Sequence, residues 1–290
     1  MVHLKFGVVG AGHIGKRHME MIRRNPAFQL TAFADIRSRS ECGVDETVPH
    51  YDSIERMLDA HEELDVVCIC TPNGFHAEQS ILAIKSDCHV VIEKPMALNR
   101  QDGEDILHTA LSRGKQVFCV MQNRYSPPSE WLKEVVDRGL LGEIYQVHVD
   151  CFWNRDDRYY YPGGWHGTKD LDGGTLFTQF SHFIDLLYWM FGDVKNASSI
   201  MKNSHHKNII EFEDNGISII EFENGTIGSI NYTVNACKSN MEGSLVIFGE
   251  KGTVKIGGQY LNELEYQSFE NYEIKNLPKG NKANNYGKYQ

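Results

Sequence analysis

The residues best suited to chemistry lie in one strongly apolar stretch, residues 172–193. Thr178, His182 and Asp185 are spaced at i, i+4 and i+7, so in a single helix they would share one stripe. Most other positions are apolar, which predicts a helix buried in a core. Buried polar groups need a partner or a ligand, so the stripe is predicted to face a site. The competing interpretation is a core histidine that holds two elements together, and we interpret Asp185 as structural.

A second candidate site is the glycine-rich run at residues 10–15, which reads GAGHIG and follows an apolar run. Such a turn lets the backbone approach a pyrophosphate, and the helix that follows offers its positive end to an anion. Asp35 ends the next apolar run, where a carboxylate can accept hydrogen bonds from ribose hydroxyls. Together these features predict dinucleotide binding, with a turn used only for packing as the alternative. Asp35 would repel a 2′-phosphate, which favours NAD over NADP, although Arg37 and Arg39 could soften that preference.

Three short motifs follow further apolar runs: TPN at 71–73 with His76, EKP at 93–95, and QNR at 122–124. The carboxyl ends of parallel strands meet at one edge of a sheet, which is where such sheets bind ligands. The positions therefore suit a binding site. For each motif taken alone, an ordinary structural turn is as good an interpretation as a binding site.

The first part of the chain alternates between strand and helix patterns. Strands are expected at 5–9, 29–34, 64–70, 89–92 and 116–121, and helices at 52–61, 75–86 and 101–113. This alternation predicts an α/β Rossmann domain, a doubly wound parallel sheet that binds NAD, over residues 1–123.

The second part of the chain reads mainly as strands. A helix is expected at 131–138, and strands at 144–153, 195–202, 209–212, 217–222, 226–234, 244–249 and 253–256. Asn224-Gly225 is hairpin turn chemistry. We therefore expect an α+β substrate domain over 124–290 with a mainly antiparallel, open-faced sheet, whose free face would form a homo-oligomer, a dimer or tetramer. The chain ends in a polar tail at 281–290, whereas members of the family named below usually continue into a further helix, which raises the possibility that a C-terminal helix is missing.

Charge and composition restrict the partners. The formal net charge is −10, which argues against nucleic acid or an anionic membrane as the main partner. No apolar run is long enough to span a membrane, and no secretory signal is visible, so a cytoplasmic location is expected. The seven cysteines are scattered, and neither they nor the histidines have the spacing of a metal site, so no metal is expected.

These motifs together resemble the glucose–fructose oxidoreductase / inositol dehydrogenase (Gfo/Idh/MocA) family. The resemblance rests on the glycine fingerprint with Asp35, on T-P-N-x-x-H and on E-K-P. It implies that Lys94 reaches the nicotinamide and the substrate together. The predicted cofactor-binding residues are Gly10, Gly12, His13, Ile14, Gly15, Asp35, Arg37, Thr71, Pro72, Asn73, His76, Glu93, Lys94 and Gln122.

The second half is similar to the UDP-N-acetylglucosaminuronate dehydrogenases of that family. The similar stretches are QNRY at 122–125, YY with GWHGT at 160–168, residues 171–185, and NMEGS at 240–244. The resemblance implies oxidation of a sugar 3-hydroxyl, with Lys94 and His182 as catalytic residues. Inositol-type members place an Asp where this chain has Thr178, so His182 would lack a carboxylate partner. The predicted substrate-binding residues are Lys94, Asn123, Arg124, Arg155, Arg158, Tyr160, Trp165, Thr178, Gln179 and His182.

An anionic nucleotide sugar would also suit the local charge. Arg124, Arg155, Arg158, His166 and Lys169 lie close in the sequence of an otherwise acidic chain, and arginine suits phosphate and carboxylate. A solvated loop is the alternative for each residue. Three other functions stay open: a dehydrogenase of another sugar or polyol, an NAD-dependent glycosidase of the same fold, and a cofactor-binding protein without turnover.

Overall fold

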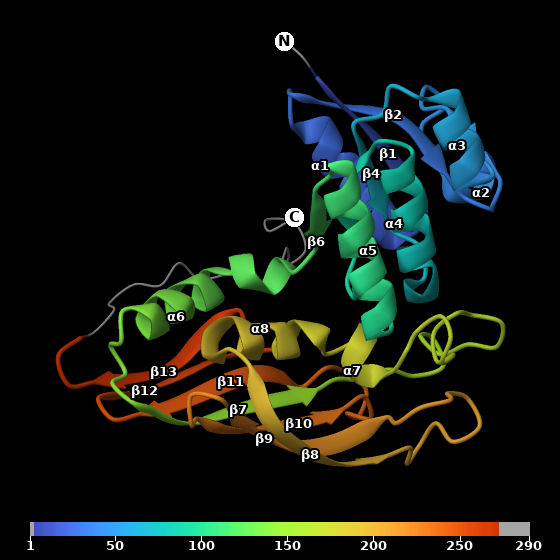
Figure 1. The fold of residues 1–290 in the computed structure, drawn as a ribbon. Coiled ribbons are helices and arrows are strands. Elements are labelled where there is room, and N and C mark those ends of the chain that lie inside the picture. The colour runs from blue at the N-terminus through green and yellow to red at the C-terminus, as the bar shows by residue number, and fades with distance from the viewer. Residues whose placement is uncertain (1–2, 273–290) are drawn as a thin grey trace. The chain divides into compact units, whose positions relative to one another are not determined.

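The computed structural model describes residues 3–272, which form two compact units. Among these residues, the first unit contains 3–120 together with Asp170–Gly173, and the second contains Met121–Lys169 and 174–272. Figure 1 shows the elements of both. The polar tail at 281–290, and the question of a further helix, fall outside the described residues.

The first unit is built on a six-stranded sheet in the order β3-β2-β1-β4-β5-β6, and all its strand pairs are parallel. This is the doubly wound arrangement expected for residues 1–123. Its elements are β1 (Leu4–Val9), α1 (His13–Arg24), β2 (Phe28–Ala34), α2 (Arg39–Cys42), β3 (His50–Tyr51), α3 (Ile54–Ala60), β4 (Val66–Ile69), the 3₁₀ helix η1 (Asn73–Phe75), α4 (His76–Lys85), β5 (His89–Ile92), α5 (Arg100–Arg113) and β6 (Val117–Cys119).

Two apolar clusters fill the two faces of this sheet. One contains residues of α3, α4 and α5, and the other contains residues of α1 and α2. All four residues of β4 are buried, as expected for a strand covered on both faces. The expected strands and long helices of this half are confirmed. The two-residue β3 and four-residue α2 were not predicted, because elements this short show no periodicity.

The second unit is built on a seven-stranded sheet in the order β13-β12-β11-β7-β10-β9-β8. Only β7 and β10 pair in parallel, so the sheet is mainly antiparallel, as predicted. Its elements are the 3₁₀ helix η2 (Gln122–Tyr125), α6 (Pro127–Asp137), β7 (Ile144–Phe152), α7 (Thr175–Thr178), α8 (Ser181–Phe191), β8 (Val194–Lys202), β9 (Asn215–Phe222), β10 (Ile227–Thr233), β11 (Glu242–Gly249), β12 (Gly252–Gly257) and β13 (Glu263–Phe269).

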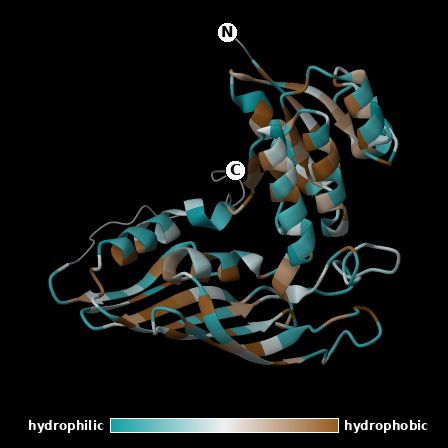
Figure 2. Ribbon diagram, in the orientation of Figure 1, coloured by the Kyte–Doolittle hydropathy of each residue, from teal (hydrophilic) through white to brown (hydrophobic). Residues whose placement is uncertain are grey.

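One face of the second sheet packs against helices, and its core includes residues of α6 and α8. Hydrophobic residues recur along its strands in Figure 2. The predicted hairpin at Asn224-Gly225 joins β9 to β10, and Gly225 has a φ of 88°, which suits glycine. Helix α6 begins at Pro127, earlier than the predicted start at residue 131. Ser126 caps this end, and proline occupies the first turn, where its missing N–H is tolerated.

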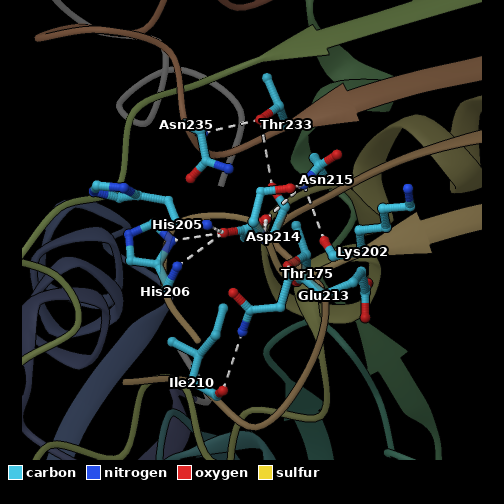
Figure 3. Close-up of polar contacts among 12 residues, drawn as sticks. Thr175, Lys202, His205, His206, Ile210, Glu213, Asp214, Asn215, Thr233 and Asn235 are labelled. Atoms are coloured by element: carbon cyan, nitrogen blue, oxygen red, sulfur yellow. Dashed lines mark hydrogen bonds and ion pairs between the residues drawn. The ribbon is translucent and has the colours of Figure 1, made fainter. Parts of the chain in front are cut away.

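The strand predicted at 209–212 is wrong. This segment forms a turn, in which the backbone N–H groups of Ile209 and Ile210 both donate to His206 O. The surrounding loop folds onto the buried carboxylate of Asp214, which accepts hydrogen bonds from the backbone N–H groups of Ser204 and His205 (Figure 3). The Asn203 side chain also donates to Ile210 O and Phe212 O, so these two carbonyl groups of the apolar run are bonded within their own loop and not to a neighbouring strand.

The single helix predicted at 172–193 is also wrong. The chain forms two helices, α7 and α8, separated at Gln179 and Phe180. Phe180 N donates to Thr175 O, five residues back, so the backbone pattern of one continuous helix is interrupted. Thr178 ends α7 and His182 lies in the first turn of α8. They consequently do not share the stripe of one helix. Ile184 and Tyr188 are 40% and 57% exposed, so α8 is not apolar and buried all round.

Candidate functional site

The glycine turn after β1 has the shape required to hold a pyrophosphate. A Cβ on Gly15 would lie 1.8 Å from Gly10 O, and a Cβ on Gly10 would lie 2.6 Å from Cys70 O, so both glycines allow close packing. A Cβ on Gly12 would meet nothing within 4 Å, which leaves open space beside the turn. Helix α1 begins at His13, and its first turn contains no acidic residue. Ile14 packs partly into the core below. The turn therefore fits the NAD pyrophosphate.

Asp35 follows β2 and supports this turn directly. Its Oδ2 accepts a hydrogen bond of 2.7 Å from the backbone N–H of Ala11. Arg37 donates to both carboxylate oxygens, through Nε at 2.9 Å and through a terminal nitrogen at 2.8 Å. Burial alone would raise the pKa of Asp35, but the hydrogen bonds from Arg37 and Ala11 lower it to about 2. Asp35 therefore remains a carboxylate at neutral pH.

The TPN motif follows β4 and is fixed by polar contacts. Thr71 Oγ1 donates to Gln79 Oε1 at 2.6 Å, and Pro72 precedes the first residue of η1. Asn73 Nδ2 donates to Asp172 O at 2.9 Å. This bond ties the motif to the segment 170–173, which belongs to the same compact unit.

His76, predicted to bind the cofactor, is completely buried. Its Nδ1 lies 2.7 Å from Pro95 O, and its Nε2 lies 2.9 Å from Thr71 O. Burial lowers the pKa of this imidazole, and the two backbone carbonyls oppose that effect. Because both ring nitrogens face the protein, the structure gives His76 a bridging position between two motif segments. A direct contact of His76 with the cofactor stays a prediction.

The EKP motif follows β5 and contains the predicted catalytic lysine. Glu93 is buried, and its Oε1 lies 2.8 Å from Nε2 of His18 on α1. Lys94 is half-buried, and its backbone N–H donates to Glu93 Oε2 at 3.3 Å. Because β1, β4 and β5 are neighbouring parallel strands, the glycine turn, TPN and EKP follow adjoining carboxyl ends. The sequence prediction of a common edge for these three motifs is consistent with the strand order.

The QNR motif begins the second unit, in η2. Gln122 is 5% exposed, and its buried Oε1 has no hydrogen-bond partner among residues 3–272. Such an orphaned acceptor fits a ligand amide. Asn123 accepts the backbone N–H of Ser126 at its carbonyl oxygen. Arg124, predicted to bind substrate, donates to both oxygens of Asp185 at 2.7 and 2.5 Å. Asp185 thus has the structural role expected of it, as the anchor of η2 on α8.

Arg155 and Gln179 meet in a polar cluster of the second unit. Arg155 Nε donates to Gln179 Oε1 at 2.6 Å, and a terminal nitrogen of Arg155 donates to Asn240 Oδ1 at 3.2 Å. Gln179 Nε2 donates to the Tyr159 hydroxyl at 2.5 Å. The guanidinium lies 5.1 Å from the ring centroids of both Trp153 and Tyr159. The cluster holds one cation in a fixed, partly buried position, which suits a carboxylate or phosphate.

Other predicted substrate residues occupy different surroundings. Tyr160 is 2% exposed and belongs to the hydrophobic core. Trp165 packs against His166, with ring centroids 3.7 Å apart. Arg158 is 79% exposed and pairs with Asp156 in its own loop. Burial favours a packing role for Tyr160, and the assignments of these three residues to substrate binding stay predictions.

Thr178 and His182 are both buried, at 7% and 6% exposed. His182 lies next to the aromatic core formed by Phe180 and Phe183, whose centroids are 6.2 Å apart. The break between α7 and α8 separates Thr178 from His182, so the two side chains extend from different helices. Their catalytic and substrate-binding roles stay predictions.

The part of the chain from residue 3 to 272 offers no cluster of three His, Cys, Asp or Glu side chains able to hold a metal ion. Within the same residues, no helix is long and apolar enough to cross a membrane.

Sequence reasoning assigned no site role to two residues of these clusters, although the NMEGS stretch begins with Asn240. Asn240 contacts Arg155 across 85 positions of sequence, and no local pattern connects them. His18 contacts Glu93 across 75 positions. The sequence could have indicated His18, because it follows Gly15 by three residues and therefore lies on the same face of α1 as the glycine turn.

The fold and the turn define the class of protein, a dinucleotide-dependent oxidoreductase with a Rossmann unit and a second, sheet-based unit. Residues 4–121 match the model of the Gfo/Idh/MocA oxidoreductase family with its NAD-binding Rossmann fold. Residues 130–255 match the C-terminal domain model of the same family. The chain belongs to the Gfo/Idh/MocA family, and NAD is its cofactor.

Individual relatives agree with this assignment. The chain is 33% identical to the WlbA dehydrogenase from Chromobacterium violaceum, solved with NADH and UDP-GlcNAcA, with a TM-score of 0.90 over 94% of this chain and 79% of that one. The WlbA dehydrogenase from Bordetella pertussis, solved with the same two molecules, is also 33% identical, with a TM-score of 0.88 over 93% and 78%. D-glucoside 3-dehydrogenase from Escherichia coli is 30% identical over 77% of this chain and 68% of its own length.

Proposed function

We propose that the protein oxidises the 3-hydroxyl of a UDP-N-acetylaminosugar uronic acid to the 3-keto sugar with NAD, in the synthesis of amino-uronic sugars for surface polysaccharide. The observation that carries this proposal is the 33% identity, over nearly the whole chain, to two dehydrogenases crystallised with NADH and UDP-GlcNAcA. The motifs of the second half, from QNRY to NMEGS, support the same substrate class.

The chain's own residues would bind, orient and deprotonate the substrate. When bound, NAD supplies the hydride acceptor. We assign the pyrophosphate to the turn at 10–15 and the adenosine ribose to Asp35. We assign to Lys94 Nζ and to the His182 imidazole the binding of the sugar 3-hydroxyl and removal of its proton. A positioned general base of this kind typically contributes about 10²–10⁴-fold to the rate.

Arg155 supports an acidic substrate. Its guanidinium is fixed by Gln179 and Asn240 and lies against two aromatic rings, so little side-chain freedom is lost when an anion binds. We propose that this cation binds the carboxylate or the diphosphate of the substrate. A neutral sugar would leave the charge without that partner.

A neutral glycoside is the second candidate substrate, since D-glucoside 3-dehydrogenase is 30% identical to this chain. Both candidates place the oxidation at a 3-hydroxyl, so the two functions differ mainly in whether the substrate is charged. Arg155→Gln separates them. It should raise KM for an acidic nucleotide sugar by about tenfold or more and hardly change KM for a neutral glycoside.

The experiment that tests the proposed function is NADH formation by the purified protein, with UDP-GlcNAcA and a neutral glucoside compared at equal concentration. The proposal expects faster turnover of the UDP-sugar acid, and loss of about 10²-fold or more in kcat for Lys94→Ala and His182→Asn. Turnover of the glucoside alone would replace the proposed substrate. Near-native turnover by both variants would overturn the assignment of the catalytic residues.

We also propose that a second copy of the chain covers the outer face of the second sheet. Ile217 and Ile219 on β9 are 59% and 62% exposed, whereas Ser218 between them is buried. Ile200 on β8 is the register partner of Ile217 and is 73% exposed. Apolar side chains thus adjoin across two strands on the face opposite the core, as in subunit interfaces.

A further inference from the structure

The catalytic segment of the first unit contains a buried ion pair whose role the proposed chemistry leaves open. His18 and Glu93 are 8% and 6% exposed, and their side chains meet at 2.8 Å. Burial alone would lower the pKa of His18, but the neighbouring Cys70, Cys68 and Glu93 raise it well above its usual range. Buried polar groups are costly to leave without a hydrogen-bond partner, so His18 and Glu93 hold each other in place.

The second oxygen of the same carboxylate contacts the predicted catalytic residue. Glu93 Oε2 accepts the backbone N–H of Lys94 at 3.3 Å, while Oε1 faces His18. The backbone of Glu93 is itself fixed, because its N–H donates to Ile69 O on the neighbouring strand. One oxygen of the Glu93 carboxylate therefore contacts His18 on helix α1, and the other contacts the backbone N–H of Lys94.

His18 also lies on the helix that begins at the nucleotide-binding turn. It follows Gly15 by three residues, which places the two on one face of α1. Gly15 packs against Gly10 O so closely that no side chain would fit. One face of α1 thus contacts the nucleotide-binding turn through Gly15 and the Glu93 carboxylate through His18.

The other neighbour of the lysine is held in a comparable way. Pro95 O lies 2.7 Å from Nδ1 of the buried His76. Lys94 is therefore flanked by two residues, each in contact with a buried histidine, while its own side chain remains half-buried.

We propose that His18 is a positioning residue for Lys94: through Glu93 it fixes the peptide segment from which the lysine reaches the nicotinamide and the sugar hydroxyl. This inference rests on the catalytic role of Lys94 in the proposed function. A misplacement of about 1 Å in a reacting group can lower a rate by about 10²-fold. Loss of His18 should thus lower kcat much more than it weakens NAD binding.

The test compares His18→Gln, Glu93→Gln and the double variant, with Met19→Leu as the control. Met19 is buried beside His18 on α1 and packs in the apolar cluster. We expect each single variant to lower kcat by about tenfold or more, and His18→Gln to change the NAD Kd and the sugar KM by less than about threefold. The double variant should be no worse than the poorer single variant, because His18 acts through Glu93. Additive effects, or a His18→Gln kcat within about twofold of wild type, would overturn the inference.

A second readout needs no sugar substrate. Acetic anhydride labels amines, and peptide mass analysis gives the labelling rate of Lys94 relative to the exposed Lys85 in the same folded protein. His18→Gln should change that ratio by about threefold or more, whereas Met19→Leu should not. If wild type oxidises none of the sugars, the proposed function fails while this ratio still tests the inference. If His18→Gln does not fold, Glu93→Gln decides the same question, and an unchanged ratio in that variant would contradict it.

Discussion

Gly12 and Gly15 have different tasks in one turn of six residues. Gly15 is required because a Cβ there would overlap Gly10 O at 1.8 Å, whereas a Cβ at Gly12 meets no protein atom within 4 Å. We therefore expect Gly12 to leave space for the cofactor, whereas Gly15 allows the turn to close.

This difference is measurable. Gly12→Ala should leave the melting temperature nearly unchanged and weaken NAD binding by about tenfold or more, since the methyl group would occupy ligand space. Gly15→Ala should destabilise the folded protein itself, by about 2 kcal/mol or more, because the backbone must move. Calorimetry and a fluorescence titration with NADH check both. Equal loss of stability in the two variants would contradict the division of tasks.

We expect Asp35 to govern the choice between NAD and NADP. Its carboxylate stays ionised at neutral pH because its pKa is lowered to about 2, and an anion there repels a 2′-phosphate. Asp35→Ser should lower the ratio of NAD to NADP affinity by about tenfold or more, measured by titration with each reduced cofactor. Arg37→Ala is the companion variant, because Arg37 pairs with this carboxylate. An unchanged ratio in Asp35→Ser would show that another group selects the cofactor.

At the residue scale, motif spacing predicted the nucleotide-binding turn and Asp35. It did not predict that both ring nitrogens of His76 face backbone carbonyls, or that Glu93 has a histidine partner 75 positions away. Local sequence patterns indicate which residue types lie at strand ends. They do not indicate which side chain of another helix will contact those residues, as His18 contacts Glu93.

At the scale of elements, the loop before β9 is organised by one carboxylate. Asp214 is completely buried and accepts hydrogen bonds from the backbone N–H groups of Ser204, His205 and His206, and from the side chains of His206 and Asn215 (Figure 3). Burial alone would raise the pKa of Asp214, and these donors lower it well below its usual range.

The same loop supports the segment that contains Arg155, Arg158, Tyr160 and Trp165. Glu211 N donates to Gly167 O at 2.9 Å, and Lys169 N donates to the Glu211 carboxylate at 2.6 Å. His206 packs edge-on against Tyr160 with centroids 5.2 Å apart. A change at Asp214 should therefore reach the candidate substrate residues through contacts within the second unit.

Asp214→Asn should lower the free energy of unfolding by about 2–3 kcal/mol, since an amide cannot accept all of these bonds. A carboxyl group with a lowered pKa stabilises the fold above its unfolded pKa of about 3.9, and this contribution is lost as pH falls through the folded pKa. The difference between wild type and variant should hence be constant from about pH 8 to pH 5 and narrow below about pH 4. Urea unfolding at several pH values measures it.

The matched control is Asp156→Asn. Asp156 also has a lowered pKa through its pair with Arg158, but both side chains are exposed, so the change should lower the free energy of unfolding far less than Asp214→Asn does. If Asp156→Asn and Asp214→Asn lowered the free energy of unfolding equally, burial of the carboxylate would not explain the stabilisation expected from Asp214.

Elements were predictable to different degrees. Long strands and helices followed from periodicity, and the β9–β10 hairpin followed from Asn224-Gly225. The break between α7 and α8 did not, because neither glycine nor proline interrupts the sequence from 175 to 191. The turn at 209–212 depends on hydrogen bonds to His206 O and from the Asn203 side chain, which the apolar pattern of the segment does not reveal.

At the scale of the molecule, the outer face of the second sheet should form the contact between subunits. Ile219→Lys places a charge on this apolar face and should convert the assembly to monomers at micromolar concentration while NAD binding is retained. Leu111→Lys is the control, since Leu111 is 82% exposed on α5 of the other unit. Sedimentation velocity measures both. A wild-type protein that is monomeric at micromolar concentration would remove the proposed interface.

Architecture at this scale followed largely from the sequence, because alternating strands and helices permit few sheet topologies. The substrate did not follow in the same way, since relatives with one fold act on different sugars. The acidic-sugar proposal therefore depends on side chains such as Arg155, whose partners come from separate segments.

The most direct measurement of the central claim uses UDP-GlcNAcA that contains deuterium at C3 of the sugar. After incubation with the protein and NAD, mass spectrometry of the reduced cofactor shows where its hydride originated. We expect NADH that is heavier by one deuterium, together with a 3-keto sugar product. Unlabelled NADH, or no NADH from this substrate although a neutral glucoside is oxidised, would contradict the proposed reaction.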